Sequence, residues 1–287
     1  MMMNSTNGIR LACSMVGLAG FAGAASGQCS DTTSPSAMYE VVFDAEWSAA
    51  THPTSFPGNP HFSPLIGGTH SDGVVFWEPG GIATLGIERM AETGSPNSLR
   101  NEVNAAILSD TAHGVLQGGA IALSPNDVSM SFEIVEEFPL VTLVTMIAPS
   151  PDWFVGVHGL SLRENGAWVD SITVDLWAYD SGTDSGVNYN SPNSNTSPKE
   201  PIRNITGEFP LDGSGRIGTY TFTRVDPVGC SAADIAEPCG VFNFFDVAAF
   251  IALYNDQDPI ADFAAPFGTL NFFDISAFIS EFSNGCP

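Results

Sequence analysis

Strict alternation of apolar and polar residues is the feature that most limits what residues 37–228 can fold into. Successive side chains of a strand point to opposite faces, and the segment MYEVVFDAEW places one apolar row on a single face: Tyr39, Val41, Phe43, Ala45 and Trp47. The segment SMSFEIVEEF continues the pattern through Met130, Phe132 and Ile134. Further strand-like runs, such as SITVDLWAYD and RIGTYTFTRV, are bounded by clusters of Gly, Pro, Asn and Ser. The pattern predicts a mainly β domain built as an antiparallel β-sandwich.

Two segments of this domain depart from simple alternation. Leu99, Val103 and Ile107 recur at intervals of four, and this spacing predicts a short helix near residues 98–109. The continuous apolar run LVTLVTMIA, residues 140–148, predicts instead a strand that is covered on both faces.

The composition changes sharply after the sequence VGCS. Residues 230–287 contain eight Asp and Glu and no Lys or Arg. The stretch ADIAEPCGVFNFFDVAAFIALYN aligns with ADFAAPFGTLNFFDISAFISEFS at a period of 28 residues, and each copy has the pattern of a loop that leads into a helix. We therefore predict a second domain over residues 229–287, made of two helical repeats.

The N-terminus has the features of a secretory signal peptide over residues 1–27, followed by a short segment, residues 28–36. Arg10 supplies a positive charge, LACSMVGLAGFAGAA an apolar core, and Ala25-Ser26-Gly27 a small-residue cleavage site. The apolar run is too short and glycine-rich for a membrane span. We expect a secreted or cell-surface protein.

Four cysteines remain once the signal peptide is removed: Cys29, Cys230, Cys239 and Cys286. An even number in an exported protein indicates two disulfides, and four cysteines permit three pairings. We favour Cys230–Cys286, because both residues follow a glycine and together they enclose the C-terminal repeats.

The charge balance limits the classes of partner. The chain carries 32 Asp and Glu against 8 Lys and Arg, a formal net charge of −24, which argues against nucleic acid and anionic membranes. Only four basic residues follow Arg163, so glycosaminoglycan binding is not expected: Lys199, Arg203, Arg216 and Arg224. The acidity is compatible with cation binding, although most of these carboxylates are expected on a solvated surface.

The stretch AYDSGTDSG, residues 178–186, is the strongest candidate for a functional site. Asp180 and Asp184 lie four residues apart in a loop of small residues that follows a strand-like run. A metal site, a pair of catalytic carboxylates and a polar turn with solvated aspartates all fit this pattern taken alone. Catalysis is the least favoured, because no nucleophile, general base and oxyanion loop recur together in this sequence.

Several motifs in one order resemble the spondin N-terminal domain of the F-spondin and mindin type. PSPDWFVGV at residues 149–157 is the most specific; it is followed by GAWV, YDSGTDSG and SPNSNTSPKEPI, and preceded by THPTSFP and GGTHSDGVVFWEPG. The resemblance covers nearly all of residues 38–226. It implies a C2-like β-sandwich, a role in extracellular adhesion or matrix rather than catalysis, and an unidentified extracellular protein or glycan as partner.

The resemblance also implies a bound calcium ion. The positions that match the family's ligands are Glu133, Asp152, Asp180 and Asp184. Calcium takes six to eight oxygen ligands, so converging carboxylates with loop carbonyls suit it. Carboxylates held close together without a cation would repel one another and would be partly protonated.

The tail resembles the dockerin type that ends in Gly-Cys and carries NFFD repeats, a small α-helical fold with two EF-hand-like loops. The first and last loop ligands would be the aspartates of each repeat: Asp234 and Asp246, then Asp262 and Asp274. The middle ligand positions hold Ala or Pro, which removes oxygen donors and argues against calcium there. The resemblance implies attachment to a cohesin-like or envelope receptor.

Several other interpretations remain open from sequence. A secreted carbohydrate-active or other hydrolase is the main alternative function, with Glu136 and Glu137 as the nearby acidic doublet; a purely structural envelope component is a third. Loop histidines at 52, 61 and 70 are spaced like zinc ligands but are more often structural. Trp153 and Trp168 could stack on a sugar but are more often core residues.

Overall fold

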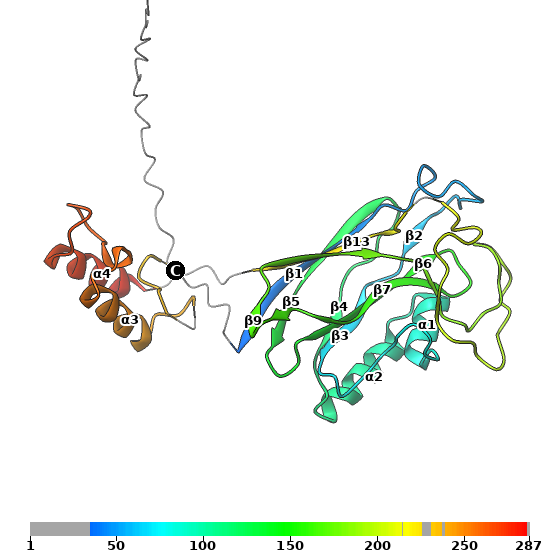
Figure 1. Cartoon of the computed structure of the whole chain (residues 1–287), viewed down its shortest axis with the longest axis horizontal. Coiled ribbons are helices and arrows are strands. Elements are labelled where there is room, and N and C mark those ends of the chain that lie inside the picture. Colours follow the sequence, from blue (N-terminus) through cyan, green and yellow to red (C-terminus); the bar gives the residue numbers. More distant parts are fainter. Residues whose placement is uncertain (1–34, 214, 226–230, 237–238, 286–287) are drawn as a thin grey trace, which may run out of the picture. The chain divides into compact units, whose positions relative to one another are not determined.

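The computed structural model describes residues 35–213, 215–225, 231–236 and 239–285 (Figure 1). The chain divides into two compact units, with the boundary between Pro227 and Val228. The predicted signal peptide lies outside the described residues. Cys239 is disulfide-bonded, whereas Cys29, Cys230 and Cys286 lie outside the described ranges, so the pairing stays a prediction.

The first unit contains a four-stranded antiparallel sheet. Its strands, in spatial order, are β10 (Ser171–Leu176), β13 (Gly218–Arg224), β1 (Ser36–Ala45) and β5 (Asn126–Val135). The apolar row predicted on β1 is buried throughout. The register opposes Phe43 to Tyr220 and Val41 to Phe222, so inward-facing rings of neighbouring strands lie side by side.

A seven-stranded sheet packs against the first. Its order is β12-β11-β7-β6-β3-β4, with β2 paired to β6. The bounds are β2 His61–Phe62, β3 Ile66–His70, β4 Ala112–Gln117, β6 Leu140–Ala148, β7 Trp153–Ser161, β11 Tyr179–Asp180 and β12 Arg203–Asn204. A short hairpin pairs β8 (Arg163–Glu164) with β9 (Ala167–Trp168). The predicted antiparallel β-sandwich is confirmed.

The main core lies between the two sheets and is dominated by aromatic side chains. Trp47, Phe43 and Phe62 are at most 1% exposed. Phe43 meets Phe62 edge-on at a centroid distance of 4.9 Å, and Trp47 meets Phe62 at 5.8 Å. Such edge-to-face pairs add about 0.5–1.5 kcal/mol to the burial of the rings.

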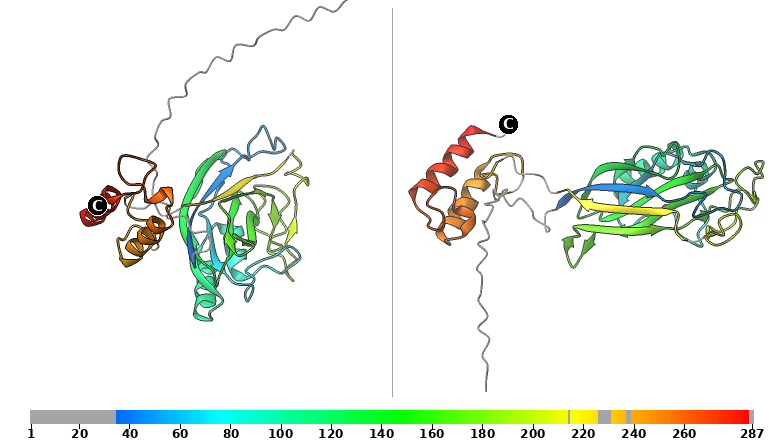
Figure 2. Two further views of the ribbon diagram at one scale, coloured as in Figure 1. Left: turned by 60° about the vertical axis from the view of Figure 1, so that its left-hand side comes forward. Right: turned by 90° about the horizontal axis from the view of Figure 1, so that it is seen from above.

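Two helices cover the outer face of the seven-stranded sheet (Figure 1 and Figure 2). The helix α2 (Asn97–Leu108) confirms the prediction near residues 98–109. It packs over β3 and β4, while α1 (Leu85–Thr93) packs over β6 and β7. The apolar run of β6 is therefore buried on both faces.

The helix α1 was not predicted, although its sequence carries the usual boundary signals. The Thr84 hydroxyl caps the N-terminus by accepting from the Ile87 amide, and Gly94 ends the helix with φ 67°. Ile87 and Met90 are fully buried. Its nine residues give too few turns for the apolar periodicity to stand out in sequence.

The second unit contains α3 (Phe244–Asn255), a short 3₁₀ turn η1 (Pro259–Ala261) and α4 (Phe272–Asn284). One α-helix therefore lies in each of the two segments predicted as repeats. The Phe250 and Phe278 rings, equivalent in the two repeats, stack at 4.0 Å with an interplanar angle of 7° and form the core of the unit. No helix in the described ranges is long and apolar enough to cross a membrane.

Each repeat helix begins with a capping box. Asn243 and Asn271 occupy the N-cap positions, and Asp246 and Asp274 reach back to the N-cap amides. The sequence NFFD therefore encodes a helix start. The predicted dockerin type of the tail stays a prediction.

Candidate functional site

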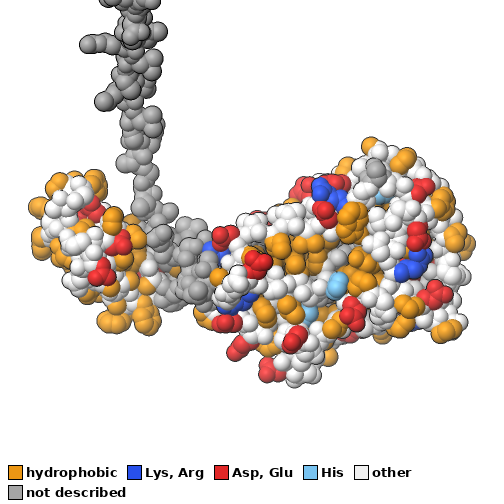
Figure 3. Space-filling model, viewed as in Figure 1, with side chains coloured by type: hydrophobic (Ala, Val, Ile, Leu, Met, Phe, Trp, Pro, Cys, Tyr) orange, Lys and Arg blue, Asp and Glu red, His pale blue; other side chains and the backbone are white. Residues whose placement is uncertain are grey.

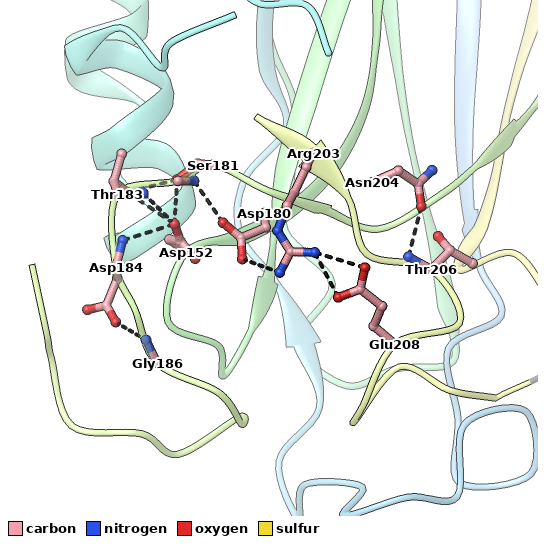
Figure 4. A network of polar contacts seen from close by, with 11 residues as sticks. Asp152, Asp180, Ser181, Thr183, Asp184, Gly186, Arg203, Asn204, Thr206 and Glu208 are labelled. Atoms are coloured by element: carbon pink, nitrogen blue, oxygen red, sulfur yellow. Dashed lines mark hydrogen bonds and ion pairs between the residues drawn. The ribbon is translucent and has the colours of Figure 1, made fainter. Parts of the chain in front are cut away.

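The candidate site forms where the chain enters β7 and leaves β11. Asp152 immediately precedes β7, and the register pairs Asp180 with Trp153, so the two aspartates are brought next to one another. The loop after β11 then carries Ser181, Thr183 and Asp184 past the Asp152 carboxylate. Figure 4 shows this network of side chains and backbone amides.

The Asp152 carboxylate is completely buried, and its two oxygens differ in their surroundings. Oδ2 accepts from the Ser181 hydroxyl at 2.9 Å, the Thr183 amide at 2.8 Å and the Asp184 amide at 3.1 Å. Oδ1 is also buried but has no hydrogen-bond partner. Burial raises the pKa of Asp152, and the three donors oppose that shift.

The Asp180 carboxylate lies between a buried acid and a base. Its Oδ1 accepts from the Gly182 amide at 2.8 Å, and its Oδ2 lies 3.5 Å from Nη2 of Arg203. Burial, and next the neighbouring Asp152 charge, raise the pKa of Asp180 to about 6. Arg203 lowers that pKa but does not cancel the other effects, because it also binds Glu208 at 2.7 Å.

The Asp184 carboxylate closes the loop on itself. Oδ1 accepts from the Gly186 amide at 2.7 Å, and Oδ2 accepts from the Ser194 amide at 2.7 Å. Both carboxylate oxygens therefore accept hydrogen bonds from backbone amides. Asp184 stabilises the loop whose own amide donates to Asp152, which makes it a support for the buried carboxylate.

Glu133 lies apart from the three aspartates. It is an exposed residue of β5, opposite Met38 and two residues before the strand ends. Asp152 follows the far end of β6, whose nine residues span roughly 27 Å at about 3.4 Å per residue. A strand glutamate close to the β5–β6 turn therefore occupies the opposite end of the sandwich from the aspartate loops.

A different glutamate, Glu92 of α1, adjoins the aspartates. Its carboxylate is hydrogen-bonded to the Thr183 side chain and lies close enough to Asp152 and Glu88 to feel their charges. Burial, and then these neighbouring carboxylates, raise its pKa. Glu92 was not among the predicted site residues because α1 was not predicted, and without that helix nothing in the sequence directs residue 92 toward the loop.

The oxygen atoms gathered here have the chemistry that a hard cation requires. A buried, unpartnered carboxylate oxygen on Asp152 is costly unless something binds it, and calcium binds carboxylate and hydroxyl oxygens. Asp180, Glu92 and Thr183 adjoin the Asp152 carboxylate. The side chains as they stand are not closed around a metal, since no group of three or more His, Cys, Asp or Glu in the described ranges is arranged as a metal centre.

A pocket of about 350 Å³ opens beside the loop. Its lining includes acidic residues, Arg203 and apolar residues: Asp180, Asp184, Glu200 and Glu208 are acidic, and Trp153, Ile205 and Phe209 are apolar. The acidic loop therefore faces solvent through a polar pocket.

The other candidates from the sequence have ordinary structural roles. Trp153 and Trp168 are 3% and 2% exposed, so they belong to the core. The histidines bind separate partners: His52 Nδ1 with Thr51 Oγ1, His61 Nδ1 with Asn59 O, and His70 Nε2 with Thr142 Oγ1. Glu136 forms an ion pair with Arg163 at 3.1 Å, which gives no support to the hydrolase alternative.

The basic side chains near the C-terminal half of the sandwich are all paired with carboxylates. Lys199 pairs with Glu88, Arg203 with Asp180 and Glu208, Arg216 with Glu46 and Asp175, and Arg224 with Asp170. These residues leave no cluster of unpaired positive charge for a sulfated glycan.

In the second unit, the aspartates of the predicted EF-hand-like loops accept from backbone amides. Asp246 Oδ1 accepts from Ile235 and Ala236 at 3.0 and 2.9 Å, and Asp274 Oδ1 from Ala264 at 2.8 Å. Asp234 binds the Gly240 amide at 2.6 Å, and Asp262 binds that of Gly268. These bonds hold each loop against its own backbone and against the start of the following helix.

Comparison with known proteins places the first unit among its relatives. A family model described as Spondin_N matches residues 37–217. Mouse Spondin-1 is 40% identical over 179 residues, which cover 59% of this chain and 22% of the mouse protein. Rat Spondin-2 is 33% identical over 183 residues, 62% of this chain and 56% of the rat protein. The chain therefore matches about half of the Spondin-2 length and about a fifth of the Spondin-1 length.

Proposed function

The chain belongs to the Spondin_N family, and from this premise we propose that it is an exported adhesion or extracellular-matrix-type protein. Its β-sandwich would serve recognition rather than catalysis, as the resemblance to spondin N-terminal domains implies. The paired state of the basic side chains favours a protein or a neutral glycan over a sulfated glycan as partner.

We further propose that the sandwich binds calcium at the Asp152 carboxylate. The observation that carries this proposal is Asp152 Oδ1, a buried carboxylate oxygen without a hydrogen-bond partner. Asp180 and Glu92 adjoin it, while Asp184 would act through the loop that it stabilises. When bound, calcium would neutralise these carboxylates; the chain's own residues hold the two loops in place through the amides that bind Asp152 Oδ2.

Calcium titration of the full exported chain by calorimetry tests this site. Asp152→Asn should abolish saturable binding, and Glu92→Gln should weaken it. Glu133→Gln is the matched control, because it makes the same chemical change at the opposite end of the sandwich and should leave the affinity unchanged. Absence of saturable calcium binding to the parent chain would refute the proposal, and loss of binding in Glu133→Gln would restore Glu133 to the ligand set.

For the second unit we propose a role in attachment. Large aromatic side chains are exposed at the start of both helices: Phe244 76%, Phe245 60%, Phe272 72% and Phe273 62%. Figure 3 shows hydrophobic and acidic side chains over this unit, with no Lys or Arg among them. Exposed apolar surface of this kind in a soluble unit is typical of an interaction site, so we propose that a cohesin-like or envelope receptor binds it.

Cell fractionation tests attachment. The full chain should be retained with the envelope or matrix fraction, and a chain that ends at residue 228 should be released. A quadruple variant, in which all four of these exposed phenylalanines are replaced by serine, should be released in the same way. Release by truncation without release by the serine variant would show that another part of the unit is responsible.

A further inference from the structure

Two strand edges are left open on one side of the sandwich. β10 is the outermost strand of the four-stranded sheet. β7 pairs with β6 along residues 154–161, but on its other side it pairs with β11 only at Trp153 and Phe154. Among the described residues, the remainder of β7 therefore has no strand partner on that side.

These two edges border a common groove. Its volume is about 450 Å³, and its lining consists of residues 156–161 of β7, Val174 and Asp175 of β10, and the neighbouring aromatic residues Trp177 and Tyr179. Trp177 is 37% exposed and provides an accessible aromatic side chain in the groove lining. The groove is separate from the aspartate cluster, because the two sites share no lining residue.

The floor of the groove is kept open by the residues of β7. At Gly159, which has φ +56°, a Cβ atom would meet no other atom within 4 Å. His158 and Gly159 lie at an irregularity of the β6–β7 register, opposite Thr142, whose hydroxyl accepts from the Gly159 amide at 3.1 Å. A side chain at position 159 would therefore project into open space, which Gly159 leaves empty.

An open strand edge restricts the kind of ligand that can bind it more than an apolar surface does. It presents alternating backbone N–H and C=O groups, which an added strand satisfies. Native proteins protect such edges with Lys, Pro, β-bulges or a covering segment. The irregular register at His158 and Gly159 is the feature of this kind among the groove residues. The groove lining contains no Lys, Arg or Pro; its one carboxylate, on Asp175, is paired with Arg216 at 2.7 Å.

We propose that this groove binds an extended segment of a partner polypeptide, which adds as a strand to the edge of β7. About six residues would be accommodated, since residues 156–161 offer roughly 20 Å of edge at about 3.3 Å per residue. Alternate apolar side chains would pack on Trp177 and Val174. Lys or Arg at the intervening positions would suit a chain whose formal net charge is −24. This inference does not depend on calcium binding.

The test uses the full exported chain and a synthetic nonapeptide, acetyl-Lys-Val-Thr-Val-Lys-Val-Thr-Val-Lys-amide. Two further versions carry N-methyl groups on the odd or on the even residues. Only alternate amides of a strand point to one neighbour, so one methylated version should bind like the parent peptide and the other should not bind. Hydrogen exchange measured by mass spectrometry should slow in the segment around residues 155–161 when the peptide is bound.

Matched variants of the protein complete the test. Trp177→Ala should weaken peptide binding about fivefold or more, as expected for an aromatic anchor. Leu108→Ala, at a side chain that is 90% exposed on α2, should leave it unchanged.

Equal binding of both methylated peptides, protection confined to other segments, or no binding would overturn the proposal. Protection of residues 155–161 in the absence of peptide that grows with protein concentration would assign the edge to a second copy of the chain instead. Binding of neutral oligosaccharides but not of the peptide would assign the groove to glycans.

Discussion

The Arg203 guanidinium lies 3.5 Å from the Asp180 carboxylate and occupies one side of a carboxylate that has Asp152 on its other side. Arg203 is half-exposed and shared with Glu208, so it compensates only part of the negative charge. The loop is thus held together by hydrogen bonds to Asp152 and Asp184 while its charges remain unbalanced. This arrangement, and the aromatic core within the C-terminal unit, lead to four testable predictions.

The first concerns pH in the absence of metal. Asp180 has a pKa of about 6 in the folded chain against an ordinary value of 3.8, so the folded state binds its proton more tightly than the unfolded state does. The resulting stability is fully present below about pH 4 and is lost as the pH rises through 6. In chelator, we expect the free energy of unfolding to fall by about 2 kcal/mol between pH 4.5 and 7 through this residue.

Urea denaturation of the parent chain and of Asp180→Asn at several pH values measures this effect. The asparagine variant should lack this part of the pH dependence. A variant that loses stability with pH as steeply as the parent would show that another group, such as Asp152 or Glu92, carries the titration.

The second prediction concerns Arg203→Gln. Removing the guanidinium takes away a positive charge that competes with any cation for Asp180, so calcium affinity should rise several-fold in calorimetry at low ionic strength. Arg216→Gln is the control, because Arg216 pairs with Glu46 and Asp175, away from the loop. A lower calcium affinity in Arg203→Gln would mean that Arg203 positions Asp180 rather than competes for it.

The third prediction concerns Gly182, which has φ +73°. A Cβ atom there would lie 2.1 Å from the Glu200 carbonyl oxygen, so Gly182→Ala combines a left-handed backbone with a clash against fixed backbone. We expect a loss of about 3 kcal/mol or more in thermal unfolding. Gly166→Ala is the matched control: its φ is +84° but nothing lies within 4 Å of the added atom, so it should lose only about 1 kcal/mol. Equal losses would show that the loop around Glu200 can move.

The sandwich and the two repeat helices could be predicted because their apolar periodicity is local. Tyr39, Val41 and Phe43 alternate within one strand, and Asn243 with Asp246 encodes a helix start within four residues. The composition of the candidate site could be predicted only in part. Asp152 and Asp180 meet through the β7–β11 pairing, which the motifs indicate by resemblance.

Glu92, the fourth carboxylate near the site, could not be predicted from the sequence. Glu92 reaches the site from a nine-residue helix, sixty positions before Asp152 in the chain, and no local pattern encodes that approach. Glu133, a strand glutamate, is separated from the aspartates by the length of β6. Position along a strand decides which end of a sandwich a residue occupies, and the alternation pattern does not contain that information.

The fourth prediction separates the stabilities of the two units. Phe278 is 2% exposed and stacks on Phe250 at 4.0 Å, whereas Phe273, on the same helix, is 62% exposed. Phe278→Ala should destabilise the C-terminal unit by about 3–5 kcal/mol, enough to unfold so small a core, while Phe273→Ala should change its stability by less than about 0.5 kcal/mol. Differential scanning calorimetry should then show the sandwich transition unchanged in both variants. A shift of the sandwich transition in Phe278→Ala would show that the two units unfold together. Retention of both transitions would show that the Cys239 disulfide keeps the second unit folded without its aromatic stack.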